Sequence, residues 1–203
     1  LAITPRFFES KVEQLVAVEK KYYPFIEKFN HQIHLIPFMG VKPHEFFDDL
    51  KPDGVVFAGG YRLYTDEIRN FEIEVLKETL KRKLPILAIC CGMWTINCYF
   101  KGTLKFNESH QAFDGEKIDM KKWIHDVKAT DIIKEKNYSV NTYHSKIIDG
   151  LGEGLMPFLV APDGSIEGCF NLKKRIIGVQ FHMENKGVSR DLTQQIMELF
   201  KKL

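Results

Sequence analysis

Two adjacent cysteines, in the stretch "ILAICCGM" at residues 86–93, are the side chains in this sequence best suited to nucleophilic chemistry. They end an apolar run and precede a glycine, a pattern typical of a buried strand that turns directly into a helix. In open α/β sheets, reactive groups collect at such carboxyl ends of strands. The two thiols are therefore candidate nucleophiles, and their neighbours decide between them.

A nucleophile on this kind of turn has a strained backbone, and the residues two before and two after it must be small because strand and helix nearly touch. These flanking residues are Ala88 and Gly92 for Cys90, but Ile89 and Met93 for Cys91. The spacing therefore favours Cys90. The alternative is that both cysteines are small buried residues that end a core strand, which is where free cysteine is often found.

A working thiolate needs help, because a free thiol with a pKa near 8.5 is only about 3% ionised at pH 7. The amide of Cys91 and the start of the following helix would direct positive charge at the Cys90 sulfur and at an oxyanion beside it. The sequence thus supplies part of the activation locally and requires a base from elsewhere.

His182 is the candidate base, because it ends another apolar run, "IIGVQFH". Glu184 follows two residues later, and on an extended backbone residues i and i+2 face the same side. The carboxylate would then hold the imidazole by its far nitrogen and stabilise the imidazolium, as the third member of a catalytic triad does.

The elements that would position these groups follow an α/β pattern in the first half of the chain. Short apolar runs alternate with amphipathic stretches, which is typical of a parallel sheet covered by helices on both faces. We expect strands at 1–4, 33–38, 54–58 and 86–89, and helices at 13–29, about 44–50 and 66–82. After a polar excursion at 105–122, short strands at 125–129, 138–144, 157–161, 165–170 and 175–182 should continue the same sheet, before a final helix from about 189.

Composition limits the classes of protein. The 203 residues, 44% of them hydrophobic, predict a single domain over 1–203. The charges are interspersed and nearly balanced, with 29 Lys and Arg against 27 Asp and Glu, which argues against nucleic acid or an anionic membrane as partner.

Apolar runs are far shorter than the roughly 20 residues that span a bilayer, and the start of the chain lacks a signal-peptide pattern, so we expect a cytoplasmic protein. Four cysteines without zinc spacing predict no disulfide framework and no metal site. We also expect no cofactor, because nothing in the sequence calls for one.

Several stretches resemble class I glutamine amidotransferase-like proteins. "GVQFHMEN" is similar to the G-V-Q-[FW]-H-P-E segment of that family, and "LAICCGMWTINCYFKGTL" to its G-I-C-R-G-M-Q-x-x-N-x-x-x-G-G-T-L segment. "DGVVFAGG", "VNTYHSKIIDGLGEGL" and "APDGSIEG" resemble further motifs of the γ-glutamyl hydrolase branch, which includes γ-glutamyl-γ-aminobutyrate hydrolases. In order, these stretches cover most of residues 53–184.

The resemblance implies a flavodoxin-like, three-layer α/β/α sandwich with a mostly parallel central sheet. It also implies a triad of Cys90, His182 and Glu184, and an oxyanion hole from the backbone of Gly59, Gly60 and Cys91. Glycine suits that loop because a Cβ would obstruct its N–H groups. The positions where relatives contact substrate correspond here to Tyr61, Arg62, Trp94, Asn141, Tyr143 and His144.

The sequence departs from the family pattern at positions around the site. Cys91 replaces an arginine, Trp94 a glutamine, Lys146 a glutamine and Met183 a proline, while Ala88 replaces a glycine and stays small. No member of the implied triad is lost. The substitutions leave the details of substrate recognition open.

The activity that the resemblance implies is hydrolysis of a small-molecule γ-glutamyl amide through a γ-glutamyl thioester, releasing glutamate. The leaving group would be an amine or a nucleotide-linked amidate. One alternative is a glutaminase subunit that delivers ammonia to a separate synthetase, and another is an inactive binding module of the same fold. The sequence leaves the pathway and the oligomeric state open, including a homo-oligomer.

Overall fold

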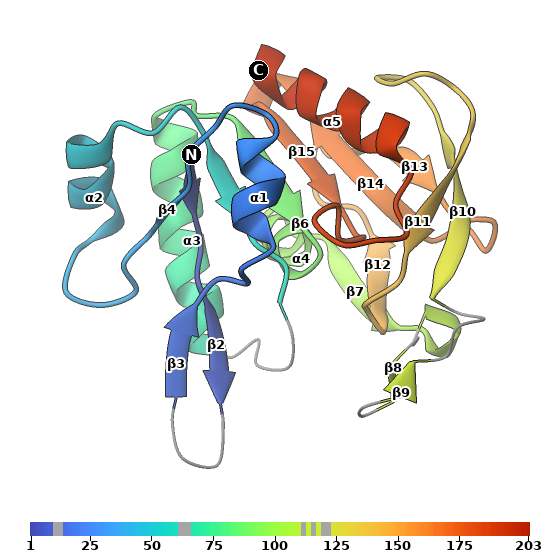
Figure 1. The fold of residues 1–203 in the computed structure, drawn as a ribbon, viewed down its shortest axis with the longest axis horizontal. Coiled ribbons are helices and arrows are strands. Elements are labelled where there is room, and N and C mark those ends of the chain that lie inside the picture. Colours follow the sequence, from blue (N-terminus) through green and yellow to red (C-terminus); the bar gives the residue numbers. More distant parts are fainter. Residues whose placement is uncertain (10–13, 61–65, 111–112, 115–116, 119–122) are drawn as a thin grey trace.

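A computed structural model of the chain describes residues 1–9, 14–60, 66–110, 113–114, 117–118 and 123–203. Its centre is an 11-stranded sheet (Figure 1). Five strands of this sheet run parallel, in the spatial order β4 (His34–Leu35), β1 (Ala2–Ile3), β5 (Val55–Phe57), β6 (Ile86–Ile89) and β15 (Ile176–Val179). The fold class is the predicted one, mixed α/β around a large sheet.

The sheet continues beyond β15 in antiparallel strands. The order from β15 is β14 (Ile166–Asn171), β13 (Met156–Val160), β10 (Ile124–Ala129) and β11 (Asn137–Asn141). A branch adds β12 (Lys146–Gly150), paired with β14, and β7 (Thr103–Phe106). The second half of the chain therefore extends the same sheet, as the sequence predicts.

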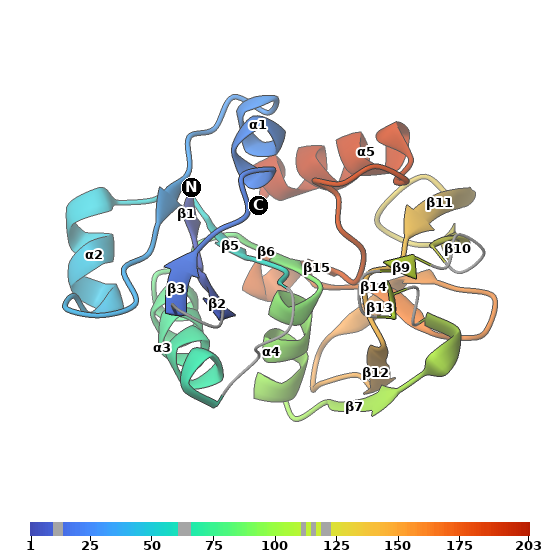
Figure 2. The ribbon, with the colours of Figure 1, turned by 60° about the horizontal axis from the view of Figure 1, so that its bottom comes forward.

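Helices cover both faces of the parallel part (Figure 2). One face packs against α1 (Tyr22–Glu27) and α5 (Arg190–Lys202), and the other against α2 (Pro43–Leu50), α3 (Asp66–Lys81) and α4 (Cys91–Tyr99). Strand β6 shows why both layers hold: Leu87 and Ile89 contribute to one apolar core, while Ile86 and Ala88 contribute to the other. Such strict alternation is the period-two geometry of a strand buried on both faces.

The predicted helix at 13–29 is wrong in its first half. Residues 14–17 form β3 (Gln14–Ala17), which pairs antiparallel with β2 (Arg6–Glu9), and the helix α1 begins only at Tyr22. Leu15 is 52% exposed, so it does not belong to the core-facing stripe, which Tyr22, Phe25 and Ile26 form in α1. Antiparallel pairing with the preceding strand β2 overrode the helical spacing.

Smaller elements lie within or near the polar excursion. They are η1 (Glu108–His110) and the hairpin of β8 (Phe113–Asp114) with β9 (Lys117–Ile118). A further short helix, η2 (Leu172–Lys174), connects β14 to β15. Strands β7 and β12 are additions to the predicted set. No helix in the described part of the chain combines the length and the apolar character needed to cross a bilayer.

Candidate active site

The site forms where β5, β6 and β15 end side by side. Cys90 follows β6 directly and is the residue before the first turn of α4, with φ +50° and ψ −109°. This is the strained turn that the sequence predicts, because a non-glycine residue rarely adopts a positive φ. A Cβ on Gly92 would lie 2.2 Å from the Phe57 carbonyl oxygen, so the small residue after the cysteine is required by the contact between helix and neighbouring strand.

Gly59, just after β5, lies between the candidate nucleophile and base. A Cβ added there would lie 3.1 Å from both the Cys90 Cβ and the His182 Nε2, and 2.5 Å from the His182 Cε1. Cys90 and the reactive edge of the imidazole therefore flank the same glycine. The structure gives a second reason for glycine at this position, which is room for the imidazole ring.

His182 is held at its far nitrogen by Glu184, with 2.5 Å between Nδ1 and Oε1. The backbone is a turn rather than the expected extended segment, since the Asn185 N–H donates to the His182 carbonyl. The predicted pair of side chains is present, but a tight turn brings them together. Asn141 fixes this turn: its side chain accepts from the His182 N–H and donates to the carbonyls of His182 and Lys186.

The Glu184 carboxylate controls the protonation of His182. Burial alone lowers the pKa of a histidine, but the Glu184 carboxylate outweighs burial here, and the net effect raises the pKa of His182 above its usual value. An imidazolium next to the cysteines is thus favoured. This is the protonation state that a leaving-group acid requires.

The two thiols titrate as a pair. The hydrogen bond from Cys90 lowers the pKa of Cys91 to about 7, with help from the charges of Arg6 and His182 and against the effect of burial. The hydrogen bond to Cys91, and then burial, raise the pKa of Cys90. One sulfur of the pair therefore ionises near neutral pH, and the two sulfurs share the remaining proton.

Some of the backbone groups in the predicted oxyanion hole already form hydrogen bonds within the protein. The Gly59 N–H donates to the Tyr22 hydroxyl at 2.8 Å, and the Gly60 carbonyl accepts from the Cys91 thiol at 3.4 Å. The Cys91 amide lies beside the Cys90 sulfur and favours its thiolate form. The amides of Gly60 and Cys91 are therefore better candidates than that of Gly59.

Arg6 brings a buried positive charge to this loop. Its side chain lies against Gly60, where a Cβ would meet the Arg6 Cδ at 2.5 Å. One guanidinium nitrogen pairs with Glu72 at 2.6 Å, and Glu72 also accepts from the hydroxyls of Thr4 and Thr95. Nε and Nη2 are buried and have no hydrogen-bond partner among the described residues. Arg6 can thus support negative charge at Cys91 and Gly60.

The candidate substrate residues have different surroundings. Trp94 donates its indole N–H to Gln180, whose side-chain amide lies 3.6 Å from the Cys90 sulfur. The Tyr143 ring contacts the His182 ring, with 5.4 Å between centroids. Asn141 is fully buried in its bonds to the His182 turn, and His144 faces Glu167 on β14. Tyr61 and Arg62 lie outside the described residues.

Sequence reasoning missed Tyr22, Arg6 and Gln180. Tyr22 and Arg6 act on Gly59 and Glu72 across 37 and 66 residues of chain, so no local spacing could have found them. Gln180 does stand inside the "GVQFH" stretch, and its position two residues before His182 was the available signal.

Comparison with known proteins relates the chain to glutamine amidotransferases. The family profile of class-I glutamine amidotransferases matches residues 17–200. The glutamine amidotransferase-like protein YvdE of Lactococcus lactis is 30% identical over 146 residues, which cover 67% of this chain and 61% of that protein. A γ-glutamyl-CDP-amidate hydrolase of Campylobacter jejuni is 27% identical over 139 residues, covering 65% of this chain and 62% of the relative.

The likeness extends to three dimensions. The crystal structure of a glutamine amidotransferase from Thermotoga maritima superposes with a TM-score of 0.64 over 99% of this chain and 82% of that one, at 17% identity. The chain spans about three fifths of the length of the curated relatives it matches. With a family profile that extends over residues 17–200, the chain belongs to the class-I glutamine amidotransferase family.

Proposed function

We propose that the protein hydrolyses the amide bond of a small γ-glutamyl compound through a thioester on Cys90. The observation that carries the proposal is the placement of Cys90, at φ +50° on the strand-to-helix turn, beside the same glycine as the imidazole that Glu184 holds. A strained cysteine, a partnered histidine and nearby backbone amides are the parts that acyl transfer needs.

In the proposed reaction, the Cys90 thiolate attacks the γ-carbonyl carbon and forms a carbon–sulfur bond. The amides of Gly60 and Cys91 stabilise the oxyanion, and the His182 imidazolium gives its Nε2 proton to the departing nitrogen as the carbon–nitrogen bond breaks. Water then attacks the thioester while His182 takes its proton. The carbon–sulfur bond breaks, glutamate leaves, and the thiolate is restored.

Two features favour a γ-glutamyl substrate. A relative described as a γ-glutamyl-CDP-amidate hydrolase is similar over about two thirds of this chain, and its substrate contains this bond. The buried guanidinium of Arg6 beside Gly60 suits the carboxylate of a glutamyl group, because two of its nitrogens have no partner among the described residues. We propose an amine or a nucleotide-linked amidate as the leaving group.

The test is glutamate release by the purified chain alone. The substrates are γ-glutamyl-p-nitroanilide, a γ-glutamyl amine, a nucleotide-linked γ-glutamyl amidate and free glutamine. We expect multiple turnovers of at least one of the first three without a partner protein. Turnover of glutamine alone, stimulated by an added synthetase, would instead support the ammonia-delivering role. No glutamate release from any substrate would contradict the proposal.

A further inference from the structure

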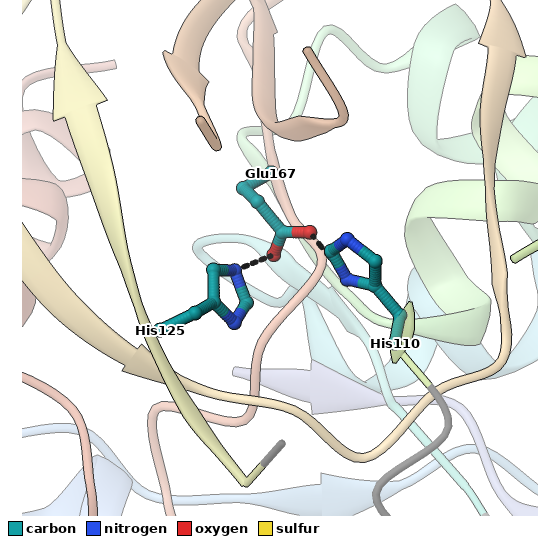
Figure 3. A group of neighbouring side chains, drawn as sticks. All are labelled: His110, His125 and Glu167. Atoms are coloured by element: carbon teal, nitrogen blue, oxygen red, sulfur yellow. Dashed lines mark ion pairs between the residues drawn. The ribbon is translucent and has the colours of Figure 1, made fainter. Parts of the chain in front are cut away.

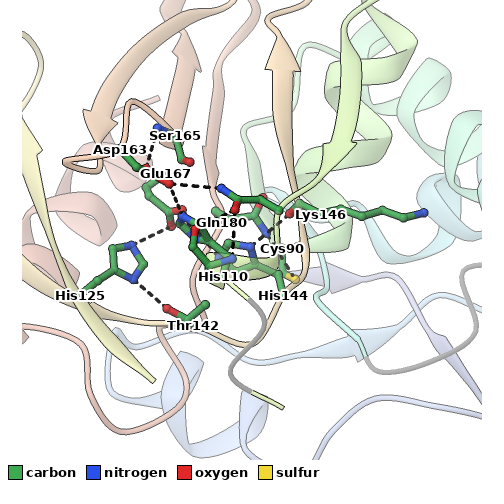
Figure 4. Close-up of polar contacts among 12 residues, drawn as sticks. Cys90, His110, His125, Thr142, His144, Lys146, Asp163, Ser165, Glu167 and Gln180 are labelled. Carbon is green, nitrogen blue, oxygen red and sulfur yellow. Dashed lines mark hydrogen bonds and ion pairs between the residues drawn. The ribbon is translucent and has the colours of Figure 1, made fainter. Parts of the chain in front are cut away.

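A second cluster of reactive side chains surrounds the carboxylate of Glu167, separate from the cysteine pair. Three histidines contribute to it from different segments: His110 from η1, His125 from β10 and His144 from the chain between β11 and β12. Figure 3 shows His110 and His125 on the two sides of the carboxylate, and Figure 4 adds His144. The side chains of Glu167 and His144 are fully buried, that of His110 is 6% exposed, and that of His125 is 21% exposed.

Each histidine directs one nitrogen at Glu167 without forming a hydrogen bond. The distances are 3.6 Å from His110 Nδ1, 3.7 Å from His144 Nε2 and 3.8 Å from His125 Nε2, all beyond the range of a hydrogen bond. These three nitrogens and both Glu167 oxygens are buried and have no hydrogen-bond partner among the described residues. Five such atoms facing one another are costly unless something binds them.

The opposite ring nitrogens are all occupied. His110 Nε2 lies 3.0 Å from the Asp163 carboxylate, and His144 Nδ1 lies 3.1 Å from the Lys146 carbonyl. These oxygens only accept, so each of the two rings donates outward, and the inward nitrogen of a neutral ring in this tautomer carries a lone pair. His125 Nδ1 lies 2.7 Å from the Thr142 hydroxyl. Histidines that ligate metals are typically held in this way by an outer oxygen.

A proton does not satisfy the cluster as a cation would. A proton on Glu167 can be donated to only one of the three facing nitrogens, so the other two would stay without a hydrogen-bond partner among the described residues. In a tetrahedral zinc site with bonds of about 2.0–2.2 Å, ligand atoms lie about 3.3–3.6 Å apart. The distances from His110 and His125 to the Glu167 carboxylate need to contract by only a few tenths of an ångström to reach these values. Together, Glu167 and Asp163 also balance two positive charges.

We propose that His110, His125 and Glu167 bind a divalent transition-metal ion of the zinc type, with His144 facing its fourth position. One donor atom from each of the three ligands lies within 4.8 Å of the other two. Imidazole and carboxylate are the donors that zinc accepts in mixed nitrogen and oxygen sites. A cavity of about 240 Å³ lined by His110, His125 and Asp163 gives the ion a route to the cluster.

The ion would connect segments that are far apart in the sequence. It would tie η1, in the polar excursion, to β10 and β14 of the sheet. Two contacts connect Glu167 to the candidate active site (Figure 4). The backbone carbonyl of Glu167 accepts a hydrogen bond from the Gln180 N–H, and the side-chain amide of Gln180 contacts the Cys90 sulfur. We assign the ion a structural role, which does not depend on the proposed hydrolysis.

The test uses the full chain, stripped with a chelator and titrated with Zn²⁺ alone by calorimetry and thermal unfolding. We expect one ion per chain, and a rise in Tm of roughly 5–10 °C when free Zn²⁺ is about 100 times Kd. Glu167→Gln and His125→Ala should each weaken binding more than about 100-fold, while Asp163→Asn, which changes an outer contact, should weaken it about 10–100-fold. Because His125 is partly exposed, its variant keeps the test valid if Glu167→Gln fails to fold.

Controls separate this cluster from other zinc ligands. His44→Ala removes an exposed histidine on α2, and Cys90→Ser removes a thiol of the dithiol pair, so neither should change the affinity or the stoichiometry. With Co²⁺ as the probe, the spectrum should lack a sulfur charge-transfer band. Absence of Zn²⁺ binding to the wild-type chain, unchanged binding in both ligand variants, or loss of binding in Cys90→Ser would overturn the proposal.

Discussion

Cys90→Ala should lower kcat for γ-glutamyl hydrolysis by on the order of 10⁴-fold or more, whereas Cys91→Ala should lower it less than about tenfold. The first variant removes the atom that we propose forms the thioester, and losses of a nucleophile are of this size in other hydrolases. The second keeps the Cys91 backbone amide, which lies beside the Cys90 sulfur, and loses the thiol that donates to Gly60 and is hydrogen-bonded to the Cys90 thiol. Initial rates with γ-glutamyl-p-nitroanilide measure both effects.

The matched control for this comparison is Cys98→Ala, which removes an exposed cysteine from the same helix. Its activity should equal that of the wild type, and circular dichroism should show that all three variants fold. Equal losses in the Cys90 and Cys91 variants, or an active Cys90→Ala protein, would contradict the assignment of the nucleophile. The comparison matters because the two thiols share one proton, so ionisation alone does not distinguish them.

Glu184→Gln should lower kcat on the order of 10³-fold while changing KM little. The carboxylate overcomes the effect of burial on His182 and raises the pKa of the imidazole. A neutral amide of the same shape removes that charge, so burial would lower the pKa of His182, and the ring could adopt the wrong tautomer. The proton donor to the leaving nitrogen would then be scarce at neutral pH.

The pH–rate profile makes this prediction specific to the ion pair. In the wild type, the limb of kcat that reports protonated His182 should fall at a pH above the usual range of histidine, and in Glu184→Gln it should move to lower pH. Glu198→Gln, at an exposed position on α5, is the control and should leave both kcat and the profile unchanged. A Glu184→Gln variant with wild-type kcat and an unshifted profile would remove Glu184 from the mechanism.

The parallel half of the fold could be predicted from local sequence. Strand β6 and helix α3 match their predicted ranges within a residue, because a fully apolar strand and a long amphipathic stripe are strong local signals. The hairpin of β2 and β3 was not predictable in this way. Its two strands are adjacent in the sequence, but the exposed Leu15 continued the helical spacing of residues 18–26 and hid the second strand.

In the candidate site, too, features set by neighbouring residues could be predicted and contacts between distant segments could not. The turn at Cys90 and the contact of His182 with Glu184 depend on neighbours in sequence, so the residue pattern indicated both. The role of Tyr22 under Gly59 arises only when distant segments pack together. The histidine cluster was even less predictable from the sequence. The spacing of residues predicted no metal site, because the donor atoms of the cluster come from separate segments that only the folded sheet brings together.

The central claim, that Cys90 carries the acyl group, is tested most directly by trapping the intermediate. The protein is mixed with a γ-glutamyl substrate, quenched in acid within a turnover, digested and sequenced by tandem mass spectrometry. We predict a γ-glutamyl group on Cys90, absent from Cys91 and lost on treatment with hydroxylamine. An acyl group on Cys91, or turnover without any acylated cysteine, would contradict the account.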